Sequence, residues 1–121
     1  MEYTSSETVS SLAAAGVRYT VAKISFGRRV ELTRRIRELA GRKEFAEAGD
    51  TPNGKMEAAL LASEIDRIYL MWGLLEVTGL ELDGQAATPE SLAASGPEEL
   101  FREALAAVKR QCGLSEAERK N

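Results

Sequence analysis

The stretch KMEAALLASEIDRIYLMWGLLEV, residues 55–77, decides the fold, because its apolar side chains recur at the three- and four-residue spacing of an α-helix. One face of this predicted helix is formed by Leu61, Ile65, Ile68, Tyr69, Trp72 and Leu75. A second apolar group lies roughly opposite, interrupted by Arg67, and consists of Met56, Leu60, Leu70, Met71 and Leu74. A helix that is apolar on two sides must be covered on two sides. Either neighbouring helices of a small bundle cover both, or the second group is left for a partner or a second subunit.

A long helix is expected before this one, from about Gly27 to Ala48, with Ser25 as its N-cap and Gly49 at its end. The DTPNG cluster at 50–54 is a turn between the two helices. Alternating apolar residues over 17–25 predict a strand, and that strand needs a partner. Residues 1–16, which we expect to be a flexible arm, could pair with it as a hairpin, or another subunit could supply the partner.

Past the central helix, which should end near Gly79, local signals predict a tight turn at Asp83-Gly84 and two more helices. Thr88-Pro89 opens a short helix, and a longer one runs from about residue 97 to Cys112. The predicted fold is mainly α, with three long helices, one short helix and a short N-terminal strand or hairpin. Residues 17–114 form a single helical domain in this interpretation, and 115–121 form a charged C-terminal tail.

The composition indicates one ordinary globular domain of 121 residues with a net charge of −3. Histidine is absent, which removes the commonest general base and metal ligand. The single cysteine, Cys112, cannot form an internal disulfide and falls on the apolar stripe of the last helix, so a structural role in a reducing compartment is expected. No signal peptide or membrane span is recognisable, so we expect a cytoplasmic protein that does not bind membranes.

Two short motifs suggest chemistry but lack essential parts. GDTPNGK, residues 49–55, has the glycine and lysine spacing of a phosphate-binding loop, but Met56 replaces the hydroxyl residue that holds magnesium, and a helix precedes it instead of a strand. Glu81 to Gly84 has only a fragment of a calcium loop. We therefore predict no catalytic, cofactor-binding or metal-binding residues, and a protein that is not an enzyme.

Charge placement is the most informative feature. Residues 28–43 contain seven basic side chains and only two acidic ones, Glu31 and Glu38, although the whole chain is acidic. Glu31 with Arg35 and Glu38 with Arg42 have the spacing of helical ion pairs. The remaining arginines are less easily explained, because Arg28 and Arg29 lie in the first helical turn, where the helix dipole disfavours cations.

Arg37, like Arg29, also projects within the apolar arc of the first helix. Such arginines predict an acidic counterpart in this chain, in another copy or on a partner protein. A nucleic acid is disfavoured by the net charge and by the lack of aromatic residues among the arginines. The predicted partner-binding residues are Arg28, Arg29, Arg34, Arg37, Met56, Leu60, Arg67, Met71 and Leu74.

Several segments together resemble a known family. They are VAKISFGRRVEL at 21–32, Glu44-Phe45, Trp72-Gly73-Leu74, GLELDG at 79–84, GPEEL at 96–100 and GLSEAERKN at 113–121. In this pattern, which covers about residues 17–121, the chain resembles the tail assembly chaperones of tailed bacteriophages and prophages.

That resemblance implies a non-enzymatic protein of the bacterial host cytoplasm that binds the tape-measure protein and helps to recruit tail-tube subunits. It implies no catalytic residues and no cofactor, and self-association is compatible with it. Two alternatives remain at this point: a structural tail or head–tail connector protein, and a small nucleic-acid-binding regulator.

Overall fold

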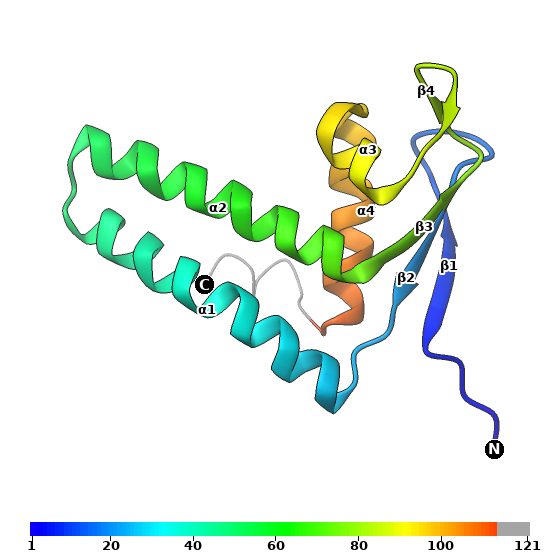
Figure 1. Ribbon diagram of the computed structural model, residues 1–121, viewed down its shortest axis with the longest axis horizontal. Coiled ribbons are helices and arrows are strands. Elements are labelled where there is room, and N and C mark those ends of the chain that lie inside the picture. Colours follow the sequence, from blue (N-terminus) through cyan, green and yellow to red (C-terminus); the bar gives the residue numbers. More distant parts are fainter. Residues whose placement is uncertain (114–121) are drawn as a thin grey trace. The chain divides into compact units, whose positions relative to one another are not determined.

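The computed structural model describes residues 1–113 and is mostly helical, with an antiparallel strand hairpin at the N-terminus, as predicted (Figure 1). The predicted charged tail, 115–121, lies outside the described residues. The elements in chain order are β1 (Ser6–Ser10), β2 (Arg18–Ala22), α1 (Phe26–Ala48), α2 (Pro52–Gly73), β3 (Leu74–Thr78), β4 (Glu81–Leu82), β5 (Gln85–Ala86), α3 (Pro89–Ser95) and α4 (Glu98–Gln111).

The chain divides into two compact units, whereas the sequence predicted one helical domain over 17–114. The first, called here the sheet unit, comprises Met1–Ile24 and Leu70–Asn121. The second, the helical unit, comprises Ser25–Tyr69 and contains α1 and most of α2. The last turn of α2 belongs to the sheet unit, so a single helix continues from one unit into the other.

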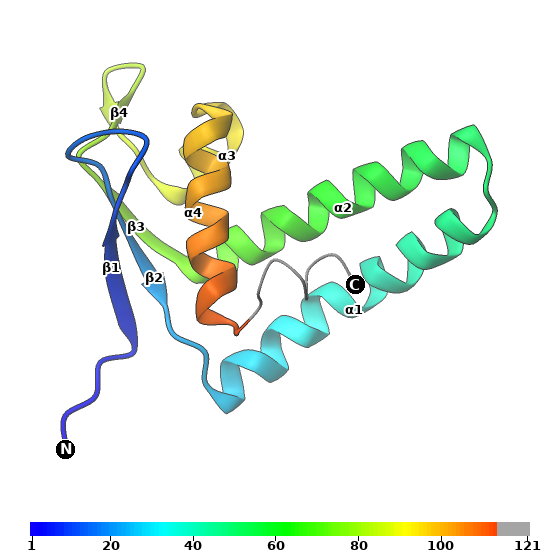
Figure 2. The same cartoon turned by 180° about the vertical axis from the view of Figure 1, so that it is seen from behind.

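The helical unit is an antiparallel pair of helices, which lie side by side in both views (Figure 1 and Figure 2). As predicted, Ser25 caps α1: its side chain accepts a hydrogen bond from the backbone N–H of Arg28 at 3.2 Å. Gly49 ends the helix, and Asp50 follows with a positive φ of 47°. The side chain of Thr51 then accepts a hydrogen bond from the N–H of Gly54 at 2.9 Å, so α2 begins at Pro52, earlier than the predicted Lys55.

The sheet unit contains a three-stranded antiparallel sheet with the order β1-β2-β3. Residues 6–10, which the sequence placed in a flexible arm, form β1, and Val9 lies opposite Tyr19. Both edges of β2 are thus occupied within one chain. The hairpin alternative is confirmed, and β2 does not need a strand from a second subunit. On one face of the sheet the hydroxyls of Thr8 and Thr20, directly opposite each other, form a hydrogen bond at 3.0 Å.

The predicted central helix is wrong at its C-terminal end. It ends at Gly73, and Leu74–Thr78 form β3, which pairs with β2 across a bulge between Thr20 and Val21. Leu74 and Val77 are buried in this strand. Short apolar runs fit a helix or a buried strand equally well, and pairing with β2, which is distant in sequence, decides between them here.

The helix α4 packs on β2 and β3 and closes the core of the sheet unit. Its buried residues include Ala104, Val108 and, just past its end, Cys112, which was predicted to lie on the apolar stripe of this helix. At the end of α2, Gly73 lies so close to α4 that a Cβ built on it would be 2.4 Å from Cγ1 of Val108.

Two smaller predictions are also confirmed. Asp83 and Gly84 both have positive φ and form the two-residue turn between β4 and β5. Thr88 caps α3 through a reciprocal hydrogen-bond pair with Ser91. None of the helices described by the structure combines the length and apolar character needed to cross a membrane.

Candidate protein-binding surface

The helical unit buries few of its apolar side chains. Leu32, Ala58 and Leu61 are its buried apolar residues, while Ile36, Leu39, Ile65 and Ile68 are only half-buried. All other buried apolar residues in the described part of the chain belong to the sheet unit. The hairpin of α1 and α2 therefore has a thin core and keeps much of its apolar surface in contact with solvent.

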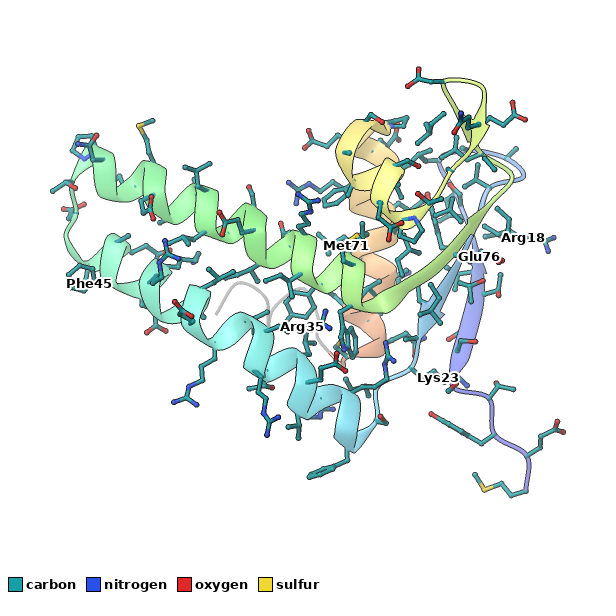
Figure 3. The ribbon with its side chains drawn as sticks, viewed as in Figure 1. Arg18, Lys23, Arg35, Phe45, Met71 and Glu76 are labelled. Atoms are coloured by element: carbon teal, nitrogen blue, oxygen red, sulfur yellow. The ribbon has the colours of Figure 1, made fainter. Side chains whose placement is uncertain are left out.

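Large apolar side chains are exposed on both helices of this unit. On α1, Phe26 and Phe45 are 85% and 84% exposed. On α2, Met56 and Leu60 are 68% and 62% exposed, as expected if the second apolar face of α2 is left uncovered. Phe45 projects outward near the turn that joins the two helices (Figure 3). Single exposed apolar residues are ordinary on protein surfaces, but four of this size on one small hairpin make the hairpin a candidate for protein binding, although Phe26 and Phe45 lie near opposite ends of α1.

The structure separates the residues that were predicted to share the partner-binding face of α2. Met56, Leu60 and Arg67 are exposed in the helical unit, whereas Met71 is half-buried in the sheet unit. Leu74 must be removed from the predicted site, because it is only 2% exposed and lies in β3, opposite Val21. The helical periodicity that grouped it with Met56 and Leu60 ends before it.

Some basic residues of α1 are neutralised within the hairpin. Arg35 pairs with Glu31 at 2.7 Å, as predicted, and Lys43 pairs with Glu47 at 2.6 Å. Arg42 contacts Glu57 of α2 at 3.4 Å, although the sequence had assigned it to Glu38. Glu57 was missed because the sequence does not reveal the register of α1 against α2. All three pairs are solvent-exposed, so each contributes little to stability.

Most of the arginines predicted to bind a partner have no ion pair among the residues that the structure describes. Arg29, Arg34, Arg37 and Arg67 are exposed and make no ion pair or hydrogen bond with any residue that the structure describes. Arg28 is half-buried in the first turn of α1. Arg34 and Arg37, three residues apart on α1, line the same groove.

This groove of the helical unit is open and has a volume of about 720 Å³. Its lining residues are Arg34, Arg37, Glu38, Gly41, Arg42, Phe45 and Ala46 of α1, with Glu57 of α2. The groove unites two of the predicted partner-binding arginines with residues that were not predicted to bind a partner. Gly41 and Phe45 were missed because neither has a signal of its own. Their spacing of four residues, and that of Arg37 and Gly41, places them on one helical face.

A second polar cluster joins the loop after β1 to α4 in the sheet unit. One carboxylate oxygen of Glu103 accepts hydrogen bonds from the backbone N–H groups of Leu12 and Ala13 at 2.8 and 3.1 Å. The other accepts hydrogen bonds from the hydroxyl of Ser11 and from that of Tyr19, the latter at 2.8 Å. The sequence did not predict this cluster, because its partners are about ninety residues apart.

The cluster shifts the pKa values of two of its members. Burial alone would raise the pKa of the Glu103 carboxyl, but the hydrogen bonds from Ser11, Tyr19, Leu12 and Ala13 outweigh it and lower the pKa. Burial, together with the neighbouring Glu103 carboxylate, raises the pKa of Tyr19 to about 12. Three of the four hydrogen-bond donors lie in the loop at residues 11–13 and the fourth is Tyr19 of β2, so the Glu103 carboxylate acts as a clamp that holds this loop and β2 to α4.

Comparisons with models of known protein families, with curated proteins and with solved structures give no match to this chain.

Proposed function

We propose that this chain is a non-enzymatic protein-binding protein and that its helical unit, Ser25–Tyr69, is the binding surface. One observation carries the proposal: α1 and α2 expose large apolar side chains while only Leu32, Ala58 and Leu61 are buried in this unit. A partner that covered these side chains would supply the packing that the hairpin lacks.

The energetic gain from such coverage is substantial. Moving an exposed side chain of the size of Phe, Leu or Met out of water contributes roughly 1.5–3 kcal/mol. Phe26, Phe45, Met56 and Leu60 are the main contributors on this surface. Met56 suits a surface of this kind because its flexible thioether adapts to the shape of what it contacts. The guanidinium groups of Arg34 and Arg37, which have no ion-pair partner among residues 1–113, would fix the orientation of the partner through its acidic groups.

We further propose that the partner belongs to a phage or prophage tail, as the resemblance to tail assembly chaperones implies. In this proposal the chain acts in the host cytoplasm, binds the long tape-measure protein, keeps it from aggregating and helps to recruit tail-tube subunits. An antiparallel helical hairpin supports this proposal physically, because a helical client lies readily along the groove between or beside two helices.

Affinity capture with matched variants tests the binding surface. Tagged full-length chain carrying Phe45→Ser and Leu60→Ser should lose the partner that the wild-type chain captures from its own host. The control carries Leu12→Ser and Leu75→Ser, which remove similarly exposed apolar side chains from the sheet unit. The control should retain the partner. Equal capture by both variants would place the binding surface elsewhere.

The identity of the partner has its own test. The tape-measure protein encoded in the same gene cluster should be captured by the wild-type chain, and tails should fail to assemble when the chain is deleted. No association, with normal tails in the deletion strain, would refute the tail-assembly proposal while leaving the hairpin open to another protein partner.

A further inference from the structure

We infer that the groove on α1, lined by Arg34, Arg37, Gly41 and Phe45, binds an acidic amphipathic helix whose apolar side chain fits over Gly41. This inference rests on the proposed protein-binding function and adds the position of the site and the chemistry of its ligand.

Gly41 is one of the residues that line the groove. It lies in the interior of α1, where glycine is the poorest residue apart from proline. Two other helical glycines have a reason within the chain: a Cβ on Gly73 would be 2.4 Å from Val108, and one on Gly54 would be 2.5 Å from the carbonyl oxygen of Ala46. Gly27 also has open space around it, but it lies in the first turn of α1 and does not line the groove. A Cβ on Gly41 would meet nothing within 4 Å. The open space at Gly41, called here the notch, is not filled by any residue that the structure describes.

The charges around the notch select the ligand. Arg34 and Arg37 are neighbours on one face of α1, where like charges disfavour each other unless an anion lies between them. Arg42 is already paired with Glu57, whereas Arg34 and Arg37 have no ion-pair partner among the described residues. Guanidinium groups hold carboxylates through two parallel hydrogen bonds. Glu38, the remaining charged group of the lining, makes no ion pair among the described residues and would accept a basic group at the edge of the ligand.

Other occupants fit less well. A second copy that docked through the same face would bring the arginines of both α1 helices together. A nucleic acid would meet the carboxylates of Glu38 and Glu57 beside the arginines, on a chain with a net charge of −3. A protein helix with glutamates flanking an apolar stripe satisfies the arginines, the exposed ring of Phe45 and the notch at Gly41 together.

A display library tests this inference with the full-length chain as bait. The library presents one helical scaffold in which the stripe facing the bait is leucine or alanine and the flanking positions are glutamate, lysine or glutamine. Selection on the wild-type chain should enrich glutamate over lysine at the flanking positions. On the variant with Arg34→Glu and Arg37→Glu, the preference should reverse to lysine.

Glycine variants test the notch. Gly41→Gln introduces a good helix former but fills the gap, so the selected helices should bind it at least about tenfold more weakly, the factor equivalent to losing one well-placed contact. The control is Gly27→Gln, because Gly27 is also a glycine of α1 with open space around it but does not line the groove. Gly27→Gln should leave the affinity unchanged.

Several outcomes would overturn the inference. Enrichment of lysine or of neutral residues by the wild-type chain would exclude an acidic ligand. If the wild-type chain binds duplex DNA in a salt-sensitive way and the variant with Arg34→Glu and Arg37→Glu does not, the groove binds nucleic acid. If that variant has a lower oligomeric mass than the wild type, the groove binds a second copy of the chain. If helices bind but Gly41→Gln has no effect on their affinity, the groove is not their binding site, and the proposed protein-binding function is unaffected. If no helix binds, the inference fails, and capture by the Phe45→Ser and Leu60→Ser variant decides the proposed function independently.

Discussion

Glu103 shows how a single side chain can organise a segment far away in sequence. Its carboxylate receives two backbone N–H groups from the loop after β1 and two hydroxyls, and so fixes that loop to α4. Glu103→Gln keeps the size of the side chain but replaces one acceptor oxygen with an amide donor. We expect a loss of about 1–2 kcal/mol in the free energy of unfolding, measured by urea denaturation. Glu99→Gln, one helical turn earlier in α4, changes an exposed side chain and should alter the free energy of unfolding by less than about 0.5 kcal/mol. Equal effects of the two variants would show that the hydrogen bonds of Glu103 do not stabilise the fold.

The same cluster predicts a pH dependence at both ends of the scale. The pKa of Glu103 is lowered from 4.5, so its contribution to stability is complete above that pH and is lost as the pH falls through the lower, folded-state pKa. The stability difference between wild type and Glu103→Gln should therefore shrink below pH 4.5.

The pKa of Tyr19 is raised from 10.0 to about 12, so the contribution of Tyr19 to stability is complete below pH 10.0 and is lost as the pH rises toward 12. The ultraviolet phenolate absorbance that Tyr19→Phe removes should appear in the wild type only as the pH rises toward 12, and its appearance near pH 10.0 would contradict this.

At the scale of elements, the contact between the end of α2 and α4 depends on the absence of a side chain at Gly73. Gly73→Ala should cost about 1–3 kcal/mol through overpacking against Val108. Combining it with Val108→Ala should be less harmful than the sum of the two single changes, with a coupling of about 0.5–3 kcal/mol. Thermal denaturation of the four proteins measures this cycle. Strict additivity would show that the two residues do not meet.

The adjacent leucines Leu60 and Leu61 report which face of α2 is covered. Leu60 is 62% exposed and Leu61 is 2% exposed, although both have the same side chain on the same helix. Leu61→Ala should reduce stability by about 2–5 kcal/mol, and Leu60→Ala should change it by less than about 0.5 kcal/mol. Loss of helical circular dichroism during denaturation measures both. Similar losses would mean that the Leu60 face is already packed and is not available to a partner.

Local signals made some elements predictable from sequence and left others open. Ser25 and Gly49 set the ends of α1, and Thr88 sets the start of α3, because a helix cap is chosen by neighbouring residues. The end of α2 and the role of Leu74 were missed because they depend on pairing with β2. For the same reason the sequence identified the exposed Met56, Leu60, Arg34 and Arg37 individually but could not assemble the groove. That required the register of Arg42 against Glu57 and the empty space at Gly41.

At the scale of the whole molecule, the two units differ in what holds them together. The sheet unit has a closed core in which Tyr19, Leu70, Leu92 and Val108 are almost completely buried. The helical unit combines a thin core with exposed phenylalanine, methionine and leucine side chains. A protein built in this way keeps one part folded independently of its partner and presents the other part for contact.

Hydrogen–deuterium exchange of the full-length chain, alone and in complex with the partner captured from its own host, tests this division most directly. We expect amides of the helical unit to exchange faster than those of β2 and α4 in the free chain. We expect them to become protected in the complex, most strongly around Arg34 to Phe45. Protection confined to the sheet unit, with exchange in Ser25–Tyr69 unchanged, would contradict the claim that the helical hairpin is the binding surface.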